Sequence, residues 1–171
     1  MFLLKFAYEK IKKKPAPYYY NYSVFKVFGK IIRKWAVNAV APNCVFNKIR
    51  ILIYRLSGFK IGKGCFIGMK CYLDDKEYDK IKIGNNVRIS YGVYFACHGG
   101  KERACEITIG DGAYIGMRSS IISRNKDGRC EGVHIGKKAI IGACTLVNRD
   151  IPDGATAVGI PCRVLEEKAH I

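Results

Sequence analysis

The sequence lacks the features that mark membrane-spanning and secreted proteins. No apolar run reaches the roughly 18 residues of a transmembrane helix. The apolar start at residues 1–4 is interrupted by Lys5 and followed by charge, which is not the pattern of a secretory signal. We therefore expect a cytoplasmic protein. Its 171 residues suffice for one ordinary domain and are too few for two large ones.

Motifs for metal and redox chemistry are also missing. None of the eight cysteines forms a Cys-x-x-Cys pair, which gives little support to a zinc ribbon or a thioredoxin-like protein. In the expected compartment all eight should be reduced thiols, mostly as small buried packing residues. The three histidines, His98, His134 and His170, are poorly spaced for a zinc ion shared across a subunit interface. We expect no metal site.

Acidic residues are scarce in the N-terminal third. Residues 1–60 hold 13 Lys/Arg and one acid, Glu9, for a net charge of +12, whereas residues 61–171 hold 17 Lys/Arg and 13 acids, for +4. This asymmetry indicates that an acidic surface or ligand docks near one end. Nucleic acid, with stacking on the aromatic stretch from Tyr18 to Tyr22, is an alternative that we do not expect and that a salt-dependent shift assay would test.

A six-residue repeat begins at residue 61. Four groups of three hexads start at 61, 83, 109 and 135, and a large apolar residue recurs at every sixth position. Six residues per face and three faces per turn predict triangular coils of about 18 residues, stacked as parallel strands about 4.8 Å apart. The sequence therefore predicts an all-β solenoid. The large positions are Ile61, Ile67, Leu73, Ile83, Ile89, Phe95, Ile109, Ile115, Ile121, Ile135, Ile141 and Val147; the small or β-branched residues four later are Cys65, Cys71, Val87, Val93, Ala113, Ser119, Ala139 and Thr145.

Extra residues interrupt the repeat after the third hexad of each of the first three groups, at 76–82, 98–108 and 124–134. Insertions at one corner of a solenoid form loops along a single edge, which is often the functional one. We expect the candidate site along this edge.

The N-terminal segment follows a different pattern. Apolar spacing predicts helices over 24–40, capped by Ser23 and ended by Pro42, and over 46–56. A short basic amphipathic helix is predicted over 2–14, with an extended linker after it. The predicted organisation is a basic helical segment (1–57), a β-helix domain (58–165) and a tail (166–171).

Two further motifs carry a resemblance to a known family. They are the stretch from Ile141-Gly142-Ala143 to Val147-Asn148-Arg149-Asp150-Ile151-Pro152, and Val158-Gly159-Ile160-Pro161-Cys162-Arg163-Val164. Together with the hexads, over about 47–166, they resemble the hexapeptide-repeat acyltransferases. The similar branch contains galactoside, maltose and xenobiotic acetyltransferases and polysaccharide O-acetyltransferases. The resemblance implies a left-handed parallel β-helix, a homotrimer with active sites between subunits, acetyl-CoA as donor, and a hydroxyl or amine acceptor.

The resemblance also implies a catalytic base. The family's histidine stands at the end of the coil before an Ile-Thr-Ile-Gly hexad, which here is Ile107 to Gly110, and His98 occupies that place. An imidazole with a pKa near 6.5 can take the proton of an alcohol as it attacks a thioester. Backbone N–H groups at Gly99 and Gly100 could stabilise the oxyanion. His134 should point outward from the solenoid, and His170 lies in the tail.

Several residues are candidates for the partner of His98 and for the acceptor site. Leu73 should lie one coil below Phe95, so Asp74 and Asp75 are expected near His98, where they could orient its ring or bind sugar hydroxyls. Glu102 is a second candidate. The loop after His98 is shorter than is usual in the family, and this loop helps to shape the acceptor site.

The resemblance to the family also implies a binding site for the acyl donor. It points to the coil edges, where basic side chains would suit the phosphates of coenzyme A. Asn148 stands where threonine is commoner in the family. The residues are Met117, Ala143, Asn148, Arg149 and Arg163.

The leading functional hypothesis is an acetyl-CoA-dependent O-acetyltransferase that acts on a sugar hydroxyl in surface-polysaccharide biosynthesis. A lipid-linked acceptor would suit peripheral contact of residues 1–40 with the inner face of the membrane. Alternatives are a xenobiotic acetyltransferase of the streptogramin type and a binding solenoid without catalysis. The absence of regular threonine ladders argues against ice binding, and the absence of a large helical domain argues against serine acetylation.

Overall fold

The computed structural model describes residues 2–15, 24–97, 104–126 and 129–165. The chain forms two compact units, Met1–Trp35 and Ala36–Ile171. This division lies before the boundary predicted at residue 57, because the helix that precedes the first coil packs on the solenoid. Unit one contains helices α1 (Phe2–Lys12) and α2 (Val24–Trp35). Within the described ranges, no helix is both long and apolar enough to cross a bilayer.

Unit two opens with short helical turns and helix α3. A π-helical turn η2 (Ala36–Val40) replaces the last part of the α-helix predicted over 24–40, and a 3-10 turn η3 (Ala41–Asn43) follows it. Helix α3 (Asn47–Leu56) covers the first coil. Its buried Arg50 donates from Nε to the Ile67 carbonyl at 2.6 Å, and the Tyr54 hydroxyl donates to the Cys71 carbonyl at 3.4 Å. Helix α3 therefore satisfies backbone groups at the exposed end of the solenoid.

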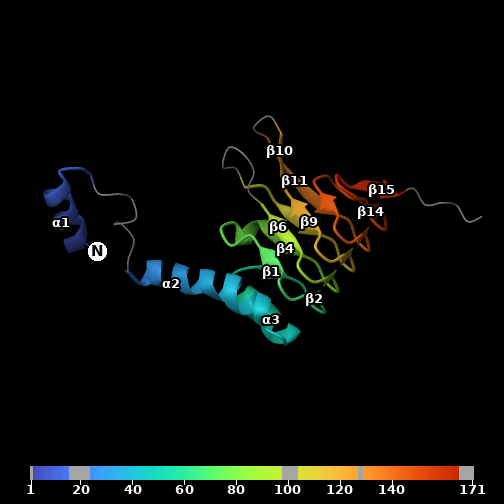
Figure 1. Cartoon of the computed structure of the whole chain (residues 1–171), viewed down its shortest axis with the longest axis horizontal. Helices are drawn as coiled ribbons and strands as arrows, with labels where there is room; N and C mark the ends of the chain where they lie inside the picture. The colour runs from blue at the N-terminus through green and yellow to red at the C-terminus, as the bar shows by residue number, and fades with distance from the viewer. Residues whose placement is uncertain (1, 16–23, 98–103, 127–128, 166–171) are drawn as a thin grey trace, which may run out of the picture. The chain divides into compact units, whose positions relative to one another are not determined.

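The rest of unit two is a left-handed parallel β-helix with three sheets, as predicted (Figure 1). The strands of the first sheet are β1 (Lys60–Ile61), β4 (Ile81–Ile83), β7 (Ile107–Ile109) and β11 (Arg129–Ile135). The second contains β2 (Phe66–Ile67), β5 (Arg88–Ile89), β8 (Tyr114–Ile115), β12 (Ile140–Ile141) and β14 (Thr156–Val158). The third contains β3 (Tyr72–Leu73), β6 (Tyr94–Ala96), β9 (Ser120–Ile122) and β13 (Leu146–Val147).

The hexad pattern matches the register and the core. Ile61 pairs with Ile83, Ile83 with Ile109, and Ile109 with Ile135, so one residue type forms a column through the coils. The large hexad positions are buried, apart from the partly buried Ile61, and all eight small positions are buried. Strand β15 (Arg163–Leu165) returns antiparallel to β14 and closes the last coil.

The three insertions lie at the corner that follows the third sheet. The first contains the 3-10 turn η4 (Tyr78–Lys80), and the third forms a hairpin of β10 (Arg124–Lys126) with β11. The second leads to Cys105, which is buried and disulfide-bonded. The prediction of eight reduced thiols is therefore wrong at this position. Spacing along the chain does not reveal which sulfur atoms an insertion brings within bonding distance.

Candidate functional site

The candidate site lies where the strands of the third sheet run into the insertions. Strands β3 and β6 are paired with Leu73 opposite Phe95, and β6 pairs with β9. The residues that follow these strands in successive coils are Asp74, Cys97 and Ser123. The predicted stacking of Leu73 below Phe95 is confirmed by the register, and it places Asp74 beside Cys97. The predicted proximity of Asp74 and Asp75 to His98 stays a prediction, because His98 lies outside the described residues.

Asp74 is fully buried, and both of its carboxylate oxygens accept backbone hydrogen bonds. Oδ1 accepts from the Lys76 N–H at 3.1 Å, at the start of the first insertion. Oδ2 accepts from the Cys97 N–H at 3.0 Å, one coil further along. A carboxylate that accepts N–H groups from two coils is a strong, geometrically specific link between them. Asp74 therefore joins the first insertion to the start of the second.

The carbonyl group of Cys97 is held as well. It accepts hydrogen bonds from the Ser123 hydroxyl at 2.7 Å and from the Cys105 N–H at 2.7 Å. The Ser123 N–H donates to the Ala96 carbonyl at 2.9 Å. The backbone N–H and carbonyl of Cys97 are thus fixed by the coils before and after it. We call Asp74, Cys97, Cys105 and Ser123 the Cys97 clamp.

The Cys97 side chain is not a nucleophile in this setting. Burial raises the pKa of its thiol from 9.0 to about 12, and the carboxylate of Asp74 adds to the shift. The thiol is therefore neutral near pH 7, whereas nucleophilic cysteines are thiolates. The importance of Cys97 lies in its backbone.

Two stacked tyrosines stand beside the clamp on the outer face of the third sheet. The rings of Tyr72 and Tyr94 lie 4.6 Å apart between centroids, with 14° between their planes. The Tyr72 hydroxyl donates to Asp75 Oδ1 at 3.2 Å. Burial, followed by the Asp75 carboxylate, raises the pKa of Tyr72. Asp75 is half-buried, so its carboxylate lies nearer to solvent than that of Asp74.

Four predicted site residues lie outside the described residues: His98, Gly99, Gly100 and Glu102. The predicted base, oxyanion donors and second acceptor candidate therefore remain predictions. His98 is bonded directly to Cys97, whose backbone is held by the clamp.

The predicted donor residues lie on both sides of β13. Met117 and Ala143 are exposed in successive turns that precede the third sheet, and the Met117 carbonyl accepts the Cys144 N–H at 2.8 Å. Half-buried Asn148 and exposed Arg149 follow β13. Arg163 is exposed on β15, opposite Val158 of β14. The structure thus brings the turns of Met117 and Ala143 together, and β13 separates both from Asn148 and Arg149.

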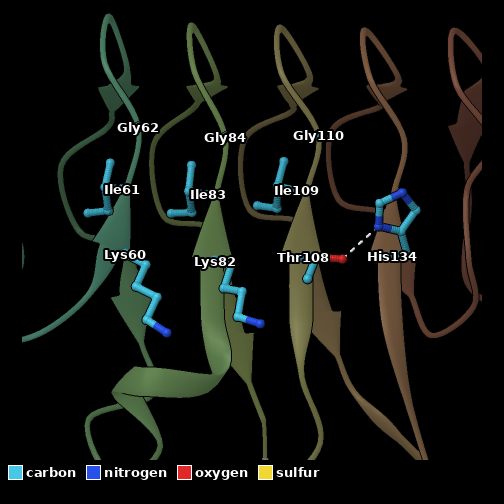
Figure 2. A pocket seen from close by; sticks show the side chains of 10 residues that line it. All are labelled: Lys60, Ile61, Gly62, Lys82, Ile83, Gly84, Thr108, Ile109, Gly110 and His134. Atoms are coloured by element: carbon cyan, nitrogen blue, oxygen red, sulfur yellow. Dashed lines mark hydrogen bonds between the residues drawn. The ribbon is translucent and has the colours of Figure 1, made fainter.

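His134 faces outward, as predicted, and has a partner that the sequence analysis missed. Its Nδ1 lies 2.6 Å from Thr108 Oγ1, and its backbone N–H donates to Asp150 Oδ1 at 2.7 Å. Figure 2 shows this pair at one end of a shallow groove of about 440 Å³ over the first sheet, in a row with Lys82 and Lys60. The sequence could have revealed this pair, because the 26-residue spacing between coils three and four places residues 108 and 134 in the same row.

A second cavity of about 310 Å³ adjoins this groove at Thr108 and His134. Lys80, Glu106, Glu131 and Asp150 contribute charge to its lining. Among the described residues, no group of three or more histidine, cysteine, aspartate or glutamate side chains is arranged to hold a metal ion.

Comparison with known proteins identifies the repeat. Residues 58–95 and 106–149 match the sequence profile described as the hexapeptide repeat of succinyl-transferase. The chain is 30% identical over 148 residues to YvoF of Bacillus subtilis, which carries a provisional acetyltransferase name, with 84% of this chain and 81% of YvoF covered. A yeast relative with a provisional acetyltransferase name, YJL218W of Saccharomyces cerevisiae, is 36% identical over 123 residues. That match covers 60% of this chain and 59% of the yeast protein.

Solved structures share the fold. An acetyltransferase from Vibrio cholerae, VCA0836, crystallised with acetyl coenzyme A, superposes with a TM-score of 0.65 at 20% identity, covering 84% of this chain and 90% of the other. A maltose O-acetyltransferase from Clostridium difficile superposes with a TM-score of 0.56 at 24% identity, covering 84% and 88%. At these identities the likeness concerns the fold.

Proposed function

The chain belongs to the hexapeptide-repeat acetyltransferases, and from this premise we propose that it transfers the acetyl group of acetyl-CoA to a hydroxyl group of a sugar. The proposed acceptor is a glycan or its precursor in surface-polysaccharide assembly, handled in the cytoplasm. Relatives with acetyltransferase names support the reaction class. The fold shared with a maltose O-acetyltransferase supports a sugar as acceptor.

One observation carries the proposal, namely the clamp on the residue next to His98. A general base must stand within hydrogen-bond reach of the proton that it takes, so its backbone must be held in place. Asp74 and Ser123 hold the two sides of the Cys97 peptide groups at 3.0 and 2.7 Å. Such a fixed attachment point is what a catalytic histidine at 98 requires. Buried Asp74 accordingly acts as a positioning residue rather than as a contact to the sugar.

In the proposed reaction, the His98 imidazole takes the proton of the acceptor hydroxyl as its oxygen attacks the thioester carbonyl carbon. The tetrahedral oxyanion is stabilised by N–H donors of the Gly99-Gly100 turn. Its collapse breaks the carbon–sulfur bond, and the imidazolium returns the proton to the coenzyme A thiolate. Asp75, half-buried beside the clamp, and Glu102 are proposed to bind sugar hydroxyls.

The proposed donor site uses Met117, Ala143, Asn148, Arg149 and Arg163. Exposed Arg149 and Arg163 suit the phosphates of coenzyme A, which favour charge-assisted hydrogen bonds. The turn at Met117 and Ala143 supplies backbone groups on the other side of β13. We propose a homotrimer in which a neighbouring subunit completes each of these sites.

The proposal is tested by free-thiol release from acetyl-CoA with a panel of sugars, nucleotide-sugars and streptogramin-type drugs. We expect release that depends on a sugar acceptor, and a loss of at least ~100-fold in His98→Ala, because a general base contributes that much or more. His134→Ala is the matched control and should keep its activity. Retained activity in His98→Ala together with loss in His134→Ala would move the base to the Thr108–His134 pair. Release with drugs alone would identify a xenobiotic acetyltransferase, and failure to bind coenzyme A would favour a binding solenoid.

A further inference from the structure

Helix α2 (Val24–Trp35) carries an exposed apolar face that includes two phenylalanines and the tryptophan. Five large apolar side chains of this helix are each at least 50% exposed. Contiguous exposed apolar surface of this size marks an interaction site. The five residues are Phe25, Phe28, Ile31, Ile32 and Trp35.

The charged residues of α2 occupy the other side of the helix. At about 100° per residue, the five apolar side chains fill one arc of about 120°, and the four cations fill a separate arc of about 100°. The helix contains no acidic residue. A Trp/Phe/Ile face opposite a Lys/Arg face is the composition of helices that lie in a membrane interface. The cations are Lys26, Lys30, Arg33 and Lys34.

The surroundings of α2 in the sequence reinforce this charge. No aspartate or glutamate occurs between Lys10 and Leu73, and residues 1–60 carry a net charge of +12. An anionic bilayer is complementary to both faces of α2, because its acyl chains can contact the apolar face and its headgroup phosphates can pair with the cations. We propose that α2 lies in the plane of an anionic lipid surface, with Phe28, Ile31 and Trp35 inserted at the boundary between headgroups and acyl chains.

The length of α2 agrees with this orientation. Twelve residues extend about 18 Å, well short of the roughly 30 Å hydrocarbon core of a bilayer. The helix therefore lies along the surface rather than across it. Tryptophan is also enriched at the membrane–water interface, because its ring is apolar and its N–H seeks a polar partner.

Other binding partners would complement only one of the two faces of α2. A second copy of this chain would bring an equally cationic segment, and residues 61–171 also carry a net positive charge, so neither offers α2 a net complementary charge. The phosphates of a nucleic acid would pair with the cations but would leave the apolar face exposed. The proposal does not depend on acyl transfer, and its test requires no acceptor.

Trp35 provides a direct probe because it is the only tryptophan in the chain and lies on the apolar face. We would titrate the full chain with vesicles of phosphatidylcholine alone and of equimolar phosphatidylcholine and phosphatidylglycerol. We expect the emission of Trp35 to shift to the blue, and brominated lipids to quench it, only with the anionic vesicles. Binding should weaken strongly in about 1 M salt, where the Debye length falls to about 3 Å.

Two variants separate the contributions of the two faces. Phe28→Ser/Ile31→Ser and Lys30→Glu/Lys34→Glu should each lower vesicle affinity by at least about tenfold, by loss of apolar burial and of headgroup attraction respectively. Lys63→Glu/Lys137→Glu makes the same charge change on exposed turns of the β-helix and should bind as the wild type does. Thermal melting of the β-helix, monitored by circular dichroism, should be unchanged in all three.

Three results would overturn the proposal. Emission that is already blue-shifted and insensitive to vesicles would mean that α2 docks on its own β-helix. A blue shift that depends on protein concentration alone would indicate a second copy. Binding to nucleic acid, with no shift on anionic vesicles, would assign the cations to that partner instead.

Discussion

At the scale of single residues, the buried carboxylate of Asp74 is the most consequential group of the candidate site. An ionisable residue with no exposed surface is rare unless its oxygens are hydrogen-bonded. Asp74 meets this condition through the N–H groups of Lys76 and Cys97, which belong to different coils. Its carboxylate thus fixes the backbone of Cys97 and is proposed, through it, to position His98.

We expect Asp74→Asn to impair both stability and turnover, because an amide cannot accept both N–H bonds without turning its own NH₂ group toward one donor. Loss of one charged, buried hydrogen bond should reduce the free energy of unfolding by about 1–3 kcal/mol, measured by urea denaturation. The turnover number should fall with little change in KM for acetyl-CoA. Asp75→Asn is the control for stability, since its half-buried carboxylate accepts from a side chain. Equal stability losses in both variants would contradict the special role of Asp74.

The Cys97 thiol predicts a pH dependence of stability. Its folded-state pKa is raised from 9.0 to about 12, so its contribution to stability is fully present below pH 9 and is lost as pH rises toward 12. We expect the free energy of unfolding to fall more steeply with pH in the wild type than in Cys97→Ala between pH 9 and pH 11. Parallel slopes in the two proteins would show that the thiol is not buried as described.

At the scale of elements, neighbouring coils approach so closely that only glycine fits at certain corners. A Cβ atom on Gly110 would lie 2.5 Å from the backbone nitrogen of Lys137 and 2.7 Å from the carbonyl carbon of Gly136. The glycine that follows each first aliphatic residue is therefore required by backbone contact between coils rather than by an unusual φ angle.

We accordingly expect Gly110→Ala to destabilise the β-helix by at least about 2 kcal/mol, since rigid backbone must move to admit the methyl group. Gly154→Ala is a matched control in the last coil, where nothing lies within 4 Å of the added Cβ but φ is +69°. It should cost about 1 kcal/mol from backbone strain alone. Thermal unfolding of both variants measures the difference. A larger loss in Gly154→Ala would contradict the proposed contact between coils.

At the scale of the whole molecule, the outer faces of the three sheets differ in character. The first sheet presents Lys60, Lys82 and Thr108. The second presents Phe66, Arg88, Tyr114 and Ile140 in register, and its three apolar members are each more than 40% exposed. A largely apolar row on the outside of a solenoid is typical of a subunit interface. We therefore assign the second sheet to the proposed trimer contact.

Light scattering after size-exclusion chromatography tests this assignment. We expect the wild type to elute with three times the chain mass of 19.2 kDa, and Ile140→Asp to elute as a monomer, because a charge would be buried in the interface. Lys60→Asp, on the polar first sheet, should remain trimeric. A monomeric wild type would remove the basis for sites shared between subunits.

The sequence alone determined the coil architecture, because a six-residue period with a large apolar residue at each start admits few ways of burying that residue. It also determined the column of Leu73 and Phe95, and hence the meeting of Asp74 with the segment before His98. These features depend only on the spacing of residues along the chain, so the sequence is sufficient to predict them.

Tertiary structure alone decided what the insertions do. At their edges, the burial of Asp74 and the hydrogen bond from Ser123 to Cys97 depend on how loops from different coils pack, and so does the disulfide at Cys105 within the second insertion. The loops have no period to define that packing. The Thr108–His134 pair stands between these cases, since the repeat places the two residues in one row and only the rotamers bring Oγ1 within 2.6 Å of Nδ1. Short-range periodicity therefore determines a solenoid, whereas contacts between its loops determine the site.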